Sequence, residues 1–439
     1  MFKNSMFKTA ALGLAALSLP FMAGCAAQAT RPAVSSAPAK VVTLDDRYLA
    51  VAKQRVAASD AALKPAYDAL IASANKALAA PLETVTAKDM TPLSGDKRDY
   101  MSMGPYWWPN PNTPNKLPYV RRDGQTNPEV RGNGLDSARM QRMNTNVRDL
   151  ALAYYFTGDK KYADRVAAQL RMWFIDPKTR MNPSLRFAQA IPGVVDGRGI
   201  GLIDTRNMWM VIDGAALIAP SGSFSAAELQ SLRGWFAEFA DWMVNSETGH
   251  EEDVWHNNHG MFYDAQLVNY LLFVGDVDGA ARRTFDAQMR RIASQIARDG
   301  RQHMELERTR PFHYSAFNLE AALRIARYGE QVSVPGMSLK ADDPRCVHPQ
   351  YRCAIDVWNF EIDERSLKRG IDFLANATAN PSSWTLATKE EPKLNFEPVV
   401  PVLLMAERAY KTGGYAKIAA GLPAETKSSL DNLLWPVIK

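Results

Sequence analysis

Apolar side chains recur at every third or fourth position along most of this chain, and that spacing places them on one face of an α-helix. In 225–246 the residues of this face are Leu229, Leu232, Trp235, Phe236, Phe239 and Trp242. Ser225 precedes them as a helix N-cap, with Glu228 at the position of a capping-box partner. Similar periodicity predicts helices over about 46–80, 136–157, 160–174, 205–219, 259–275, 278–299, 315–328, 365–376, 397–412 and 424–433.

Alternating patterns typical of strands are scarce, and no clean internal repeat is visible. Helices in close succession bury their apolar faces as a solenoid, a bundle or a closed toroid. Three long segments rich in Pro, Gly, Trp, Arg and Asn interrupt them, at 83–135, 176–204 and 330–364, and loops of that length are usually functional. We therefore expect an all-α fold, an (α/α) toroid or incomplete barrel of about six to seven helical hairpins with long functional loops.

Composition narrows the class of protein. The chain has 439 residues, of which 46% are hydrophobic and 23% charged, so a sizeable core can form and disorder of the bulk of the chain is excluded. A formal net charge of +5 is too small for a nucleic-acid binder but leaves room for a local basic groove that holds an acidic ligand. Several of the 10 Trp, 15 Tyr and 17 Phe stand in polar surroundings, which fits stacking on sugar rings.

The N-terminus carries a targeting signal. Lys3 and Lys8 precede an apolar run over 9–20 that is too short to span a membrane, and the segment ending at Cys25 resembles a bacterial lipoprotein signal. We expect a signal peptide over 1–24, a lipid anchor on Cys25 as the only membrane attachment, a flexible tether over 25–44 and one domain over 45–439. These features indicate a periplasmic lipoprotein, with ordinary secretory cleavage as the alternative.

Two cysteines remain in the mature chain, Cys346 and Cys353. In an oxidising compartment, two cysteines seven positions apart in a polar loop most simply form a disulfide. His348 lies between them, but two Cys and one His leave a structural zinc site one ligand short. We therefore expect a disulfide and no metal.

Polar residues accumulate in 251–264, where a helix is predicted to begin. We expect Asn257, Asn258 and His259 near the helix N-terminus, where free backbone N–H groups and the helix dipole favour an anion such as a carboxylate. The alternative is that Asn258 only caps the helix and His259 is structural. A zinc site at His256 and His259 lacks a third ligand and the H-E-x-x-H pattern.

A second polar segment, 305–315, also abuts a predicted helix. Tyr314 follows Arg308 there by six positions, and together with the Asn-Asn-His cluster this segment is a candidate site for uronic acid chemistry. A glycine-rich segment over 196–206 has no preceding strand, which argues against a nucleotide-binding loop. Only Arg206 is kept from it, as a groove candidate.

Consecutive aromatic residues lie among prolines at Tyr106, Trp107 and Trp108. Because they cannot all face one side, they make a poor core element and suit a rigid platform for sugar rings. Arg121 and Arg122 follow and are suited to pairing with carboxylates. The alternative is a loop that packs its own aromatic residues.

Taken in order, the segments 104–111, 117–124, 257–266 and 305–319 resemble the alginate lyase superfamily. They look closest to the polyuronate lyases of polysaccharide lyase family 38, with family 5 more distant, and the resemblance covers roughly residues 60–420. It implies an (α/α) toroid whose groove binds an anionic polysaccharide and cleaves it by β-elimination without a cofactor.

The resemblance also implies roles for individual residues. Asn258 and His259 match an Asn–His pair of the family, and Tyr314 matches its catalytic tyrosine. Arg308 matches the arginine at the spacing of family 38, while the longer spacing of family 5 keeps Arg310 open as the alternative.

Three further positions bear on the substrate. Glu252 matches an acidic residue that helps to manage the substrate carboxylate. Met261 and Phe262 stand where the family is expected to have a small polar residue and Trp, which affects substrate preference rather than chemistry.

These residue types suit β-elimination from a uronic acid. Removing the C5 proton builds negative charge on the carboxylate, and Asn258 and His259 would stabilise it as an oxyanion hole does. Tyr314 would remove the proton and then protonate the leaving O4 when both lie on one face of the sugar, with Arg308 lowering its pKa. His259 is the better base when they lie on opposite faces, as in guluronate. We expect mannuronate-rich alginate or glucuronan as the substrate.

Two other functions stay open at this stage. A glycoside hydrolase needs two carboxylates across the scissile bond, and the available ones are Glu251, Glu252, Asp253, Glu305 and Glu307. A lipoprotein that captures acidic glycans without cleaving them is the other.

Overall fold

Helices make up most of the structure. A computed structural model describes residues 34–333 and 354–438. Its longer helices are α1 (Asp46–Ala57), α2 (Lys64–Ala79), α3 (Ser137–Thr157), α4 (Lys160–Leu170), α5 (Trp209–Ile218), α6 (Ala226–Asn245), α8 (Asn258–Val274), α9 (Val277–Ala287), α12 (Pro311–Val332), α13 (Leu367–Ala379) and α14 (Val399–Tyr410). The shorter ones are α7 (Glu247–Asp253), α10 (Ala293–Gln295), α11 (His303–Leu306), α15 (Gly414–Ala420) and α16 (Asp431–Leu434).

Several predictions concern other parts of the chain. The signal peptide over 1–24, the lipidation site Cys25 and the disulfide between Cys346 and Cys353 all lie outside the described residues. Within 34–333 and 354–438, no helix is long and apolar enough to cross a membrane.

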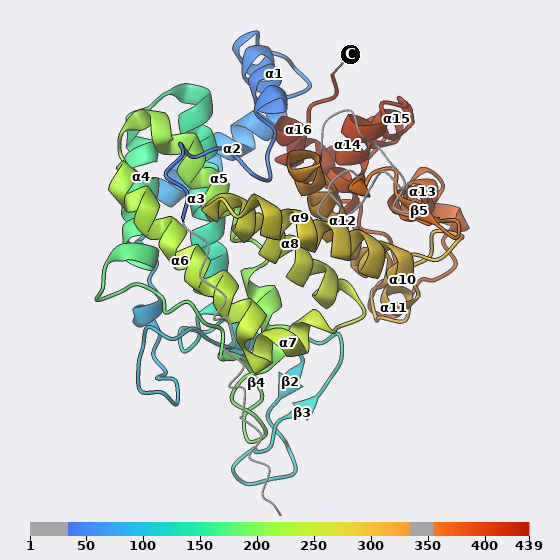
Figure 1. The fold of residues 1–439 in the computed structure, drawn as a ribbon. Helices are drawn as coiled ribbons and strands as arrows, with labels where there is room; N and C mark the ends of the chain where they lie inside the picture. The colour runs from blue at the N-terminus through green and yellow to red at the C-terminus, as the bar shows by residue number, and fades with distance from the viewer. Residues whose placement is uncertain (1–33, 334–353, 439) are drawn as a thin grey trace, which may run out of the picture. The chain divides into compact units, whose positions relative to one another are not determined.

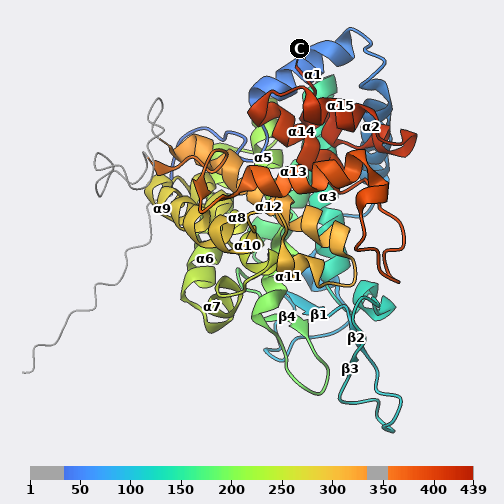
Figure 2. The same ribbon diagram turned by 90° about the vertical axis from the view of Figure 1, so that its right-hand side faces the viewer.

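The helices close into a ring. α3 packs against α2 and α5, α5 packs against α8, and α8 packs against α12. α12 packs against α14, and the short α16 contacts both α14 and α2, which completes the circuit. α4, α6, α9 and α13 pack on this ring. Figures 1 and 2 show the arrangement, and the predicted all-α toroid is confirmed.

Most of the predicted helices are present, but four are interrupted. The predicted helix over 160–174 continues after Leu170 as a π-helical turn over Arg171–Ile175, and the one over 424–433 is a 3₁₀ helix (Ala424–Ser428) followed by α16. The prediction of one helix over 46–80 is wrong, because a turn that includes Ser59 at φ 59° separates α1 from α2, and Pro65 opens α2. The predicted helix over 278–299 ends as an α-helix at Ala287 and continues as a π-helical turn over Gln288–Ile292. The capping box of α6 forms as expected, since Ser225 and Glu228 exchange hydrogen bonds.

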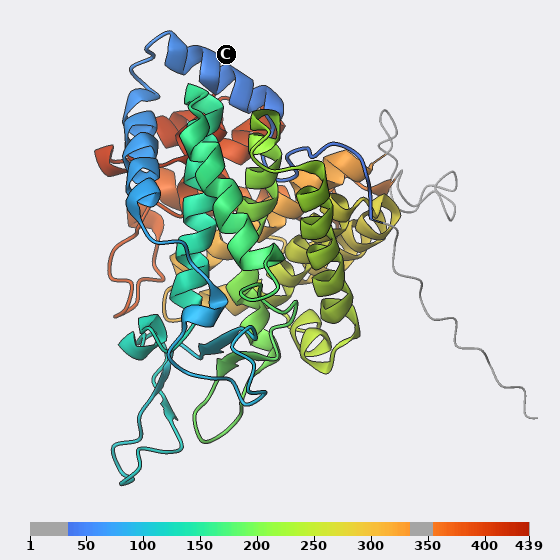
Figure 3. The ribbon, with the colours of Figure 1, turned by 90° about the vertical axis from the view of Figure 1, so that its left-hand side faces the viewer.

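Two of the three long loops build small sheets at one end of the ring, the lower end in Figure 3. β1 (Met101–Met103) pairs in parallel with β4 (Phe187–Ala190). β2 (Trp107–Trp108) and β3 (Val120–Arg121) form an antiparallel ribbon in which Trp107 faces Arg121. A third pair, β5 (Glu361–Ile362) with β6 (Arg365–Ser366), lies later in the chain. The predicted catalytic residues lie at the N-termini of α8 and α12.

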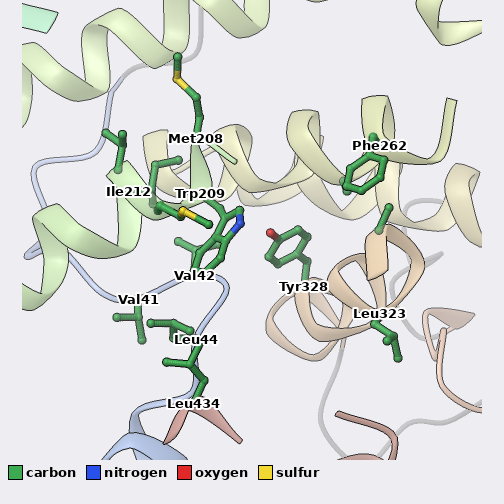
Figure 4. Close-up of a cluster of buried hydrophobic side chains, with 14 of the residues drawn as sticks. Val41, Val42, Leu44, Met208, Trp209, Ile212, Phe262, Leu323, Tyr328 and Leu434 are labelled. Carbon is green, nitrogen blue, oxygen red and sulfur yellow. The ribbon is translucent and has the colours of Figure 1, made fainter. Parts of the chain in front are cut away.

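The packed domain begins before the expected boundary at residue 45. Val41, Val42, Thr43 and Leu44 are buried, and Figure 4 shows three of them within the same apolar cluster as Trp209. Hydrogen bonds of their backbone hold this segment in place. The buried carboxylate of Asp213 accepts hydrogen bonds from the N–H groups of residues 42, 43 and 44, at 2.6, 3.1 and 2.7 Å. The domain therefore includes the chain from at least Val41 onward.

Replacing Asp213 should destabilise the fold. In Asp213→Ala three buried backbone N–H groups lose their acceptor, and we expect the free energy of unfolding to fall by about 3 kcal/mol. Asp213→Asn keeps one acceptor oxygen and should lose less. Denaturant unfolding followed by circular dichroism measures both, with Asp286→Ala as the control because Asp286 is exposed on α9. Equal stability of Asp213→Ala and the control would contradict this role.

Candidate active site

The N-terminus of α8 is built by polar capping. The side chain of Asn257 accepts a hydrogen bond from the backbone N–H of His259 at 3.1 Å, so Asn257 is the N-cap and Asn258 is the first helical residue. Directly before it, Ser246 caps α7 by accepting from the N–H of Gly249. α7 and α8 follow each other closely and pack together, so Glu252, near the end of α7, lies against the first turn of α8.

His259 is held by a buried carboxylate. Oε1 of Glu252 lies 2.9 Å from Nδ1 of His259, and Glu252 has no exposed surface. Burial raises the pKa of Glu252, and the neighbouring His259 opposes that shift. With Nδ1 engaged, Nε2 is the ring nitrogen left for other partners. The burial of Glu252 fits a role in orienting His259.

Asn258 is held by a second buried carboxylate. Glu305, on α11, accepts from the backbone N–H of Asn258 at 2.6 Å and from its side-chain amide at 2.8 Å. Burial raises the pKa of Glu305 as well, against the effect of these hydrogen bonds. The N–H groups of Asn258 and His259 are therefore occupied within the protein, contrary to the expectation that they are free for an anion. Both acids are also engaged, which weakens the case for a hydrolase pair.

Tyr314 lies on the first turn of α12. The helix starts at Pro311, and the carboxylate of Glu391 caps it by accepting from the N–H groups of Phe312 and His313 at 2.8 and 3.1 Å. The hydroxyl of Tyr314 lies 2.7 Å from that of Tyr106, which comes from the loop before β2. The sequence suggested Tyr106 only as part of a sugar platform.

Arg308 and Arg310 occupy different places. The guanidinium carbon of Arg308 lies 3.9 Å from the centre of the Tyr314 ring. Arg310 is instead the N-cap residue of α12, and no salt bridge to it occurs among the described residues. This geometry favours Arg308 as the partner of Tyr314.

The pKa of Tyr314 differs from the expectation. Burial and the neighbouring Tyr106 raise the pKa of its phenol above the ordinary value, and the cation of Arg308 lowers it by less. Tyr314 therefore rests as the neutral phenol at neutral pH. The expected lowering by an arginine is present, but burial outweighs it.

The aromatic platform is the ribbon of β2 and β3. The guanidinium of Arg122 lies 5.1 Å from the Trp108 ring centre, and Arg121 forms an ion pair with Asp123 at 2.7 Å. Trp107 and Trp108 are only half-buried, which favours a platform over a loop that packs its aromatic residues away.

Two arginines complete this end of the molecule. Arg206 lies over the ring of Phe317 on α12 at 5.6 Å and donates to the carbonyl of Ile203 at 3.1 Å. Arg198 lies 6.0 Å from the Trp107 ring centre. Sequence reasoning missed Arg198, because its glycine-rich segment was set aside when no nucleotide-binding pattern was found. The one feature of the sequence that could have indicated Arg198 is the glycine on each side of it.

The separate contacts join into one cluster. The charges of both Arg308 and His259 act on Glu305, which itself holds Asn258. Arg308 covers Tyr314, whose hydroxyl meets Tyr106. The predicted residues of two distant segments are thus brought together with a loop residue from a third. Across 34–333 and 354–438, no three His, Cys, Asp or Glu side chains are grouped so as to hold a metal ion.

Comparisons with known proteins bear on this arrangement. A sequence model of the alginate lyase family matches residues 84–348. An alginate lyase from Bacteroides ovatus of known structure is 33% identical, with a TM-score of 0.80, and the match covers 91% of this chain and all of that one. No curated protein sequence matches the chain.

More distant structures share the fold. Alginate lyase A1-III from Sphingomonas species A1 is 12% identical with a TM-score of 0.50, over 84% of this chain and 95% of that one. A variant of A1-III complexed with a tetrasaccharide is 14% identical with a TM-score of 0.53, over 91% and 96% of the two chains.

Changing Glu305 should loosen the start of α8. A glutamine offers one oxygen and turns an NH₂ group toward one of the two donors of Asn258, so Glu305→Gln should lower the free energy of unfolding by about 1–2 kcal/mol. Glu307→Gln is the matched control, since Glu307 is exposed two residues away. Denaturant unfolding measures both, and a loss of the same size in both variants would show that the Asn258 contact contributes nothing.

Proposed function

The chain belongs to the alginate lyase family and is a polysaccharide lyase, and we propose that it cleaves 1,4-linked polyuronates, either mannuronate-rich alginate or glucuronan, by β-elimination. The observation that carries the proposal is the cluster in which Arg308 covers Tyr314 while buried acids hold Asn258 and His259 beside them. The tetrasaccharide complex of the A1-III variant, which shares the fold, supports an anionic oligosaccharide as ligand.

The first task of such a site is to stabilise charge on the substrate carboxylate. Loss of the C5 proton of a uronic acid delocalises the electron pair onto that group. We assign this task to Nε2 of His259 and the guanidinium of Arg308, with Asn258 fixed beside them by Glu305. Because these donors are held before substrate binds, they need no reorganisation during the reaction, and losing one such donor typically costs about 2.7–4 kcal/mol.

The second task is proton transfer. In our proposal the phenolate of Tyr314 takes the C5 proton, the electron pair forms the C4–C5 double bond, the C4–O4 bond breaks, and the phenol returns the proton to O4. This order applies when the proton and O4 lie on the same face of the sugar. When they lie on opposite faces, His259 serves as the base and Tyr314 as the acid.

Tyr106 raises the pKa of Tyr314 in the resting structure, and in our proposal its hydroxyl then stabilises the phenolate as a hydrogen-bond donor. Burial favours the neutral phenol of Tyr314, so the phenolate needs local stabilisation. The Tyr106 hydroxyl, at 2.7 Å, can donate its proton to the phenolate oxygen, and the Arg308 cation lies against the ring. A charge-assisted O–H···O⁻ bond is among the stronger hydrogen bonds in proteins.

The surroundings of the cluster fit a polymer. Trp107 and Trp108 offer ring faces, and Arg121 and Arg122 offer cations near them for the carboxylates of further sugars. Arg206, over Phe317 on α12, offers another cation. We assign substrate binding to these residues, with Arg310 at the start of α12 and Asn257 at the start of α8.

The cellular setting is a proposal from the sequence alone. We propose a periplasmic enzyme with a lipid anchor at Cys25 and a disulfide between Cys346 and Cys353. Such an enzyme would meet polyuronate fragments outside the cytoplasm.

Tyr314→Phe should abolish most of the turnover. Because the variant loses the base and acid group but keeps the ring, we expect kcat on polymannuronate or glucuronan to fall by about 10²- to 10⁴-fold. Ultraviolet absorbance of the unsaturated product measures the reaction, and it separates elimination from hydrolysis because only elimination leaves a double bond. Tyr67→Phe is the control, with a half-buried ring on α2. Near-normal turnover by Tyr314→Phe would refute the assignment.

Arg308 should set the pH dependence. Since kcat/KM rises with pH as Tyr314 becomes phenolate, and the Arg308 cation lowers the pKa of Tyr314, Arg308→Gln should raise that pKa and move the rise to higher pH, by roughly one unit. Arg310→Gln should move it less. Profiles of kcat/KM against pH for the parent and both variants decide between the two arginines, and a larger displacement in Arg310→Gln would reverse the assignment.

A further inference from the structure

Arg198 is an arginine with a fixed position, and burial lowers its pKa while the charges of Glu251 and Asp204 raise it. Its Nε donates to the backbone carbonyl of Gln189 at 2.8 Å, and its Nη2 lies 3.3 Å from the side-chain oxygen of the same residue. The guanidinium lies over Trp107 at 6.0 Å. No carboxylate of the described residues forms a salt bridge with it. A guanidinium has five donors in a planar fork, so most of its hydrogen-bonding capacity remains open.

The residue that holds Arg198 is itself in an unusual conformation. Gln189 has φ 48°, in the left-handed region that residues other than glycine rarely adopt. Its N–H donates to the hydroxyl of Ser102 at 2.8 Å, within the pairing of β1 and β4, and its amide lies 3.4 Å from Asp204. Strained residues of this kind persist where the surroundings over-determine them, often at ligand sites.

Arg198 lies next to the catalytic cluster. A Cβ atom placed on Gly104 would fall 2.6 Å from Nη2 of Arg198 and 2.6 Å from the Trp107 ring, so the guanidinium touches the loop on both sides of Tyr106. The following residue, Gly199, donates its N–H to the Glu251 carboxylate at 2.6 Å, and Glu251 precedes the residue that orients His259. Arg198 is therefore placed between the Tyr106 loop and α7.

We propose that Arg198 binds the carboxylate of the sugar adjacent to the one whose C5 proton is removed, with Trp107 beneath that sugar and Gln189 as the residue that positions the guanidinium. The proposal rests on the proposed function. In our proposal the carboxylate of the reacting sugar is bound by His259 and Arg308, whereas Arg198 lies against the loop of Tyr106, at Gly104 and Trp107. Every sugar of a polyuronate carries a carboxylate. A second cation at the neighbouring sugar therefore favours a polyuronate over a glycan in which only occasional sugars are acidic.

This placement has a kinetic consequence. Arg198 touches neither Tyr314 nor His259, so its ion pair with the substrate is the same in the ground state and the transition state. Loss of uniform binding raises KM and leaves kcat unchanged. A residue that only supported the fold would change kcat, or thermal stability, as much as KM.

Binding to an inactive background tests the site directly. Two proteins are titrated with mannuronate tetrasaccharide by calorimetry: the single variant Tyr314→Phe and the double variant that also carries Arg198→Gln. The affinity of the double variant should be lower by about 10- to 100-fold. Arg198→Lys keeps the charge without the fork and should fall between them. In otherwise native enzyme, Arg198→Gln should raise KM by a similar factor with kcat within about twofold.

Controls separate the possible causes. Arg282→Gln removes an exposed arginine on α9 and should change neither affinity nor KM. Gln189→Gly relieves the backbone and removes the side-chain contact, so it should preserve the melting temperature and weaken binding less than Arg198→Gln. Equal affinity with and without Arg198, or an equal loss in Arg282→Gln, overturns the proposal. Failure of the proposed function looks different, because the parent enzyme would then form no unsaturated product from any polyuronate.

Discussion

The packing of α8 against α12 is the constraint on which the site depends. Phe262, on the second turn of α8, contacts Phe317 on α12 with ring centres 4.4 Å apart. Glu305, just before α12, bonds the first residue of α8. The two helices therefore begin close together, and residues some fifty positions apart in the chain lie in one cluster. A displacement of either helix would separate the imidazole from the phenol, whatever the identity of those side chains.

Helical periodicity predicted much of this from the sequence alone. It placed Asn258, His259 and Tyr314 at helix starts, and a helix start has a fixed direction and few conformations. The parts that could not be predicted depend on contacts between distant segments. Tyr106 reaches Tyr314 only because β1 pairs with β4 and the ribbon folds back, and Gln189 adopts a backbone conformation that its residue type disfavours. Neither leaves a local pattern.

The burial of individual side chains also could not be predicted from the sequence. A carboxyl group in a polar stretch of sequence is ordinarily read as exposed, yet Glu252 and Glu305 have almost no exposed surface. Taking such groups out of water favours their protonated form, as the raised pKa values of both show, and the cost is acceptable only with dedicated donors. The same balance reverses the expectation for Tyr314. Sequence supplies the arginine next to it, but only the three-dimensional packing reveals that desolvation is the larger effect.

Ring closure by α16 has a consequence for how the molecule assembles. The guanidinium of Arg55 donates to the carbonyl of Val437, across 382 positions of the chain. α1 and α2 are made early in synthesis, and the helix that seals them to α14 is made late. Bringing such remote segments together carries a loop-closure entropy that grows with their separation, and non-local contacts of this kind slow folding. The seam between α2 and α16 therefore joins the first and last helices of the ring, and it can close only after the whole domain has been made.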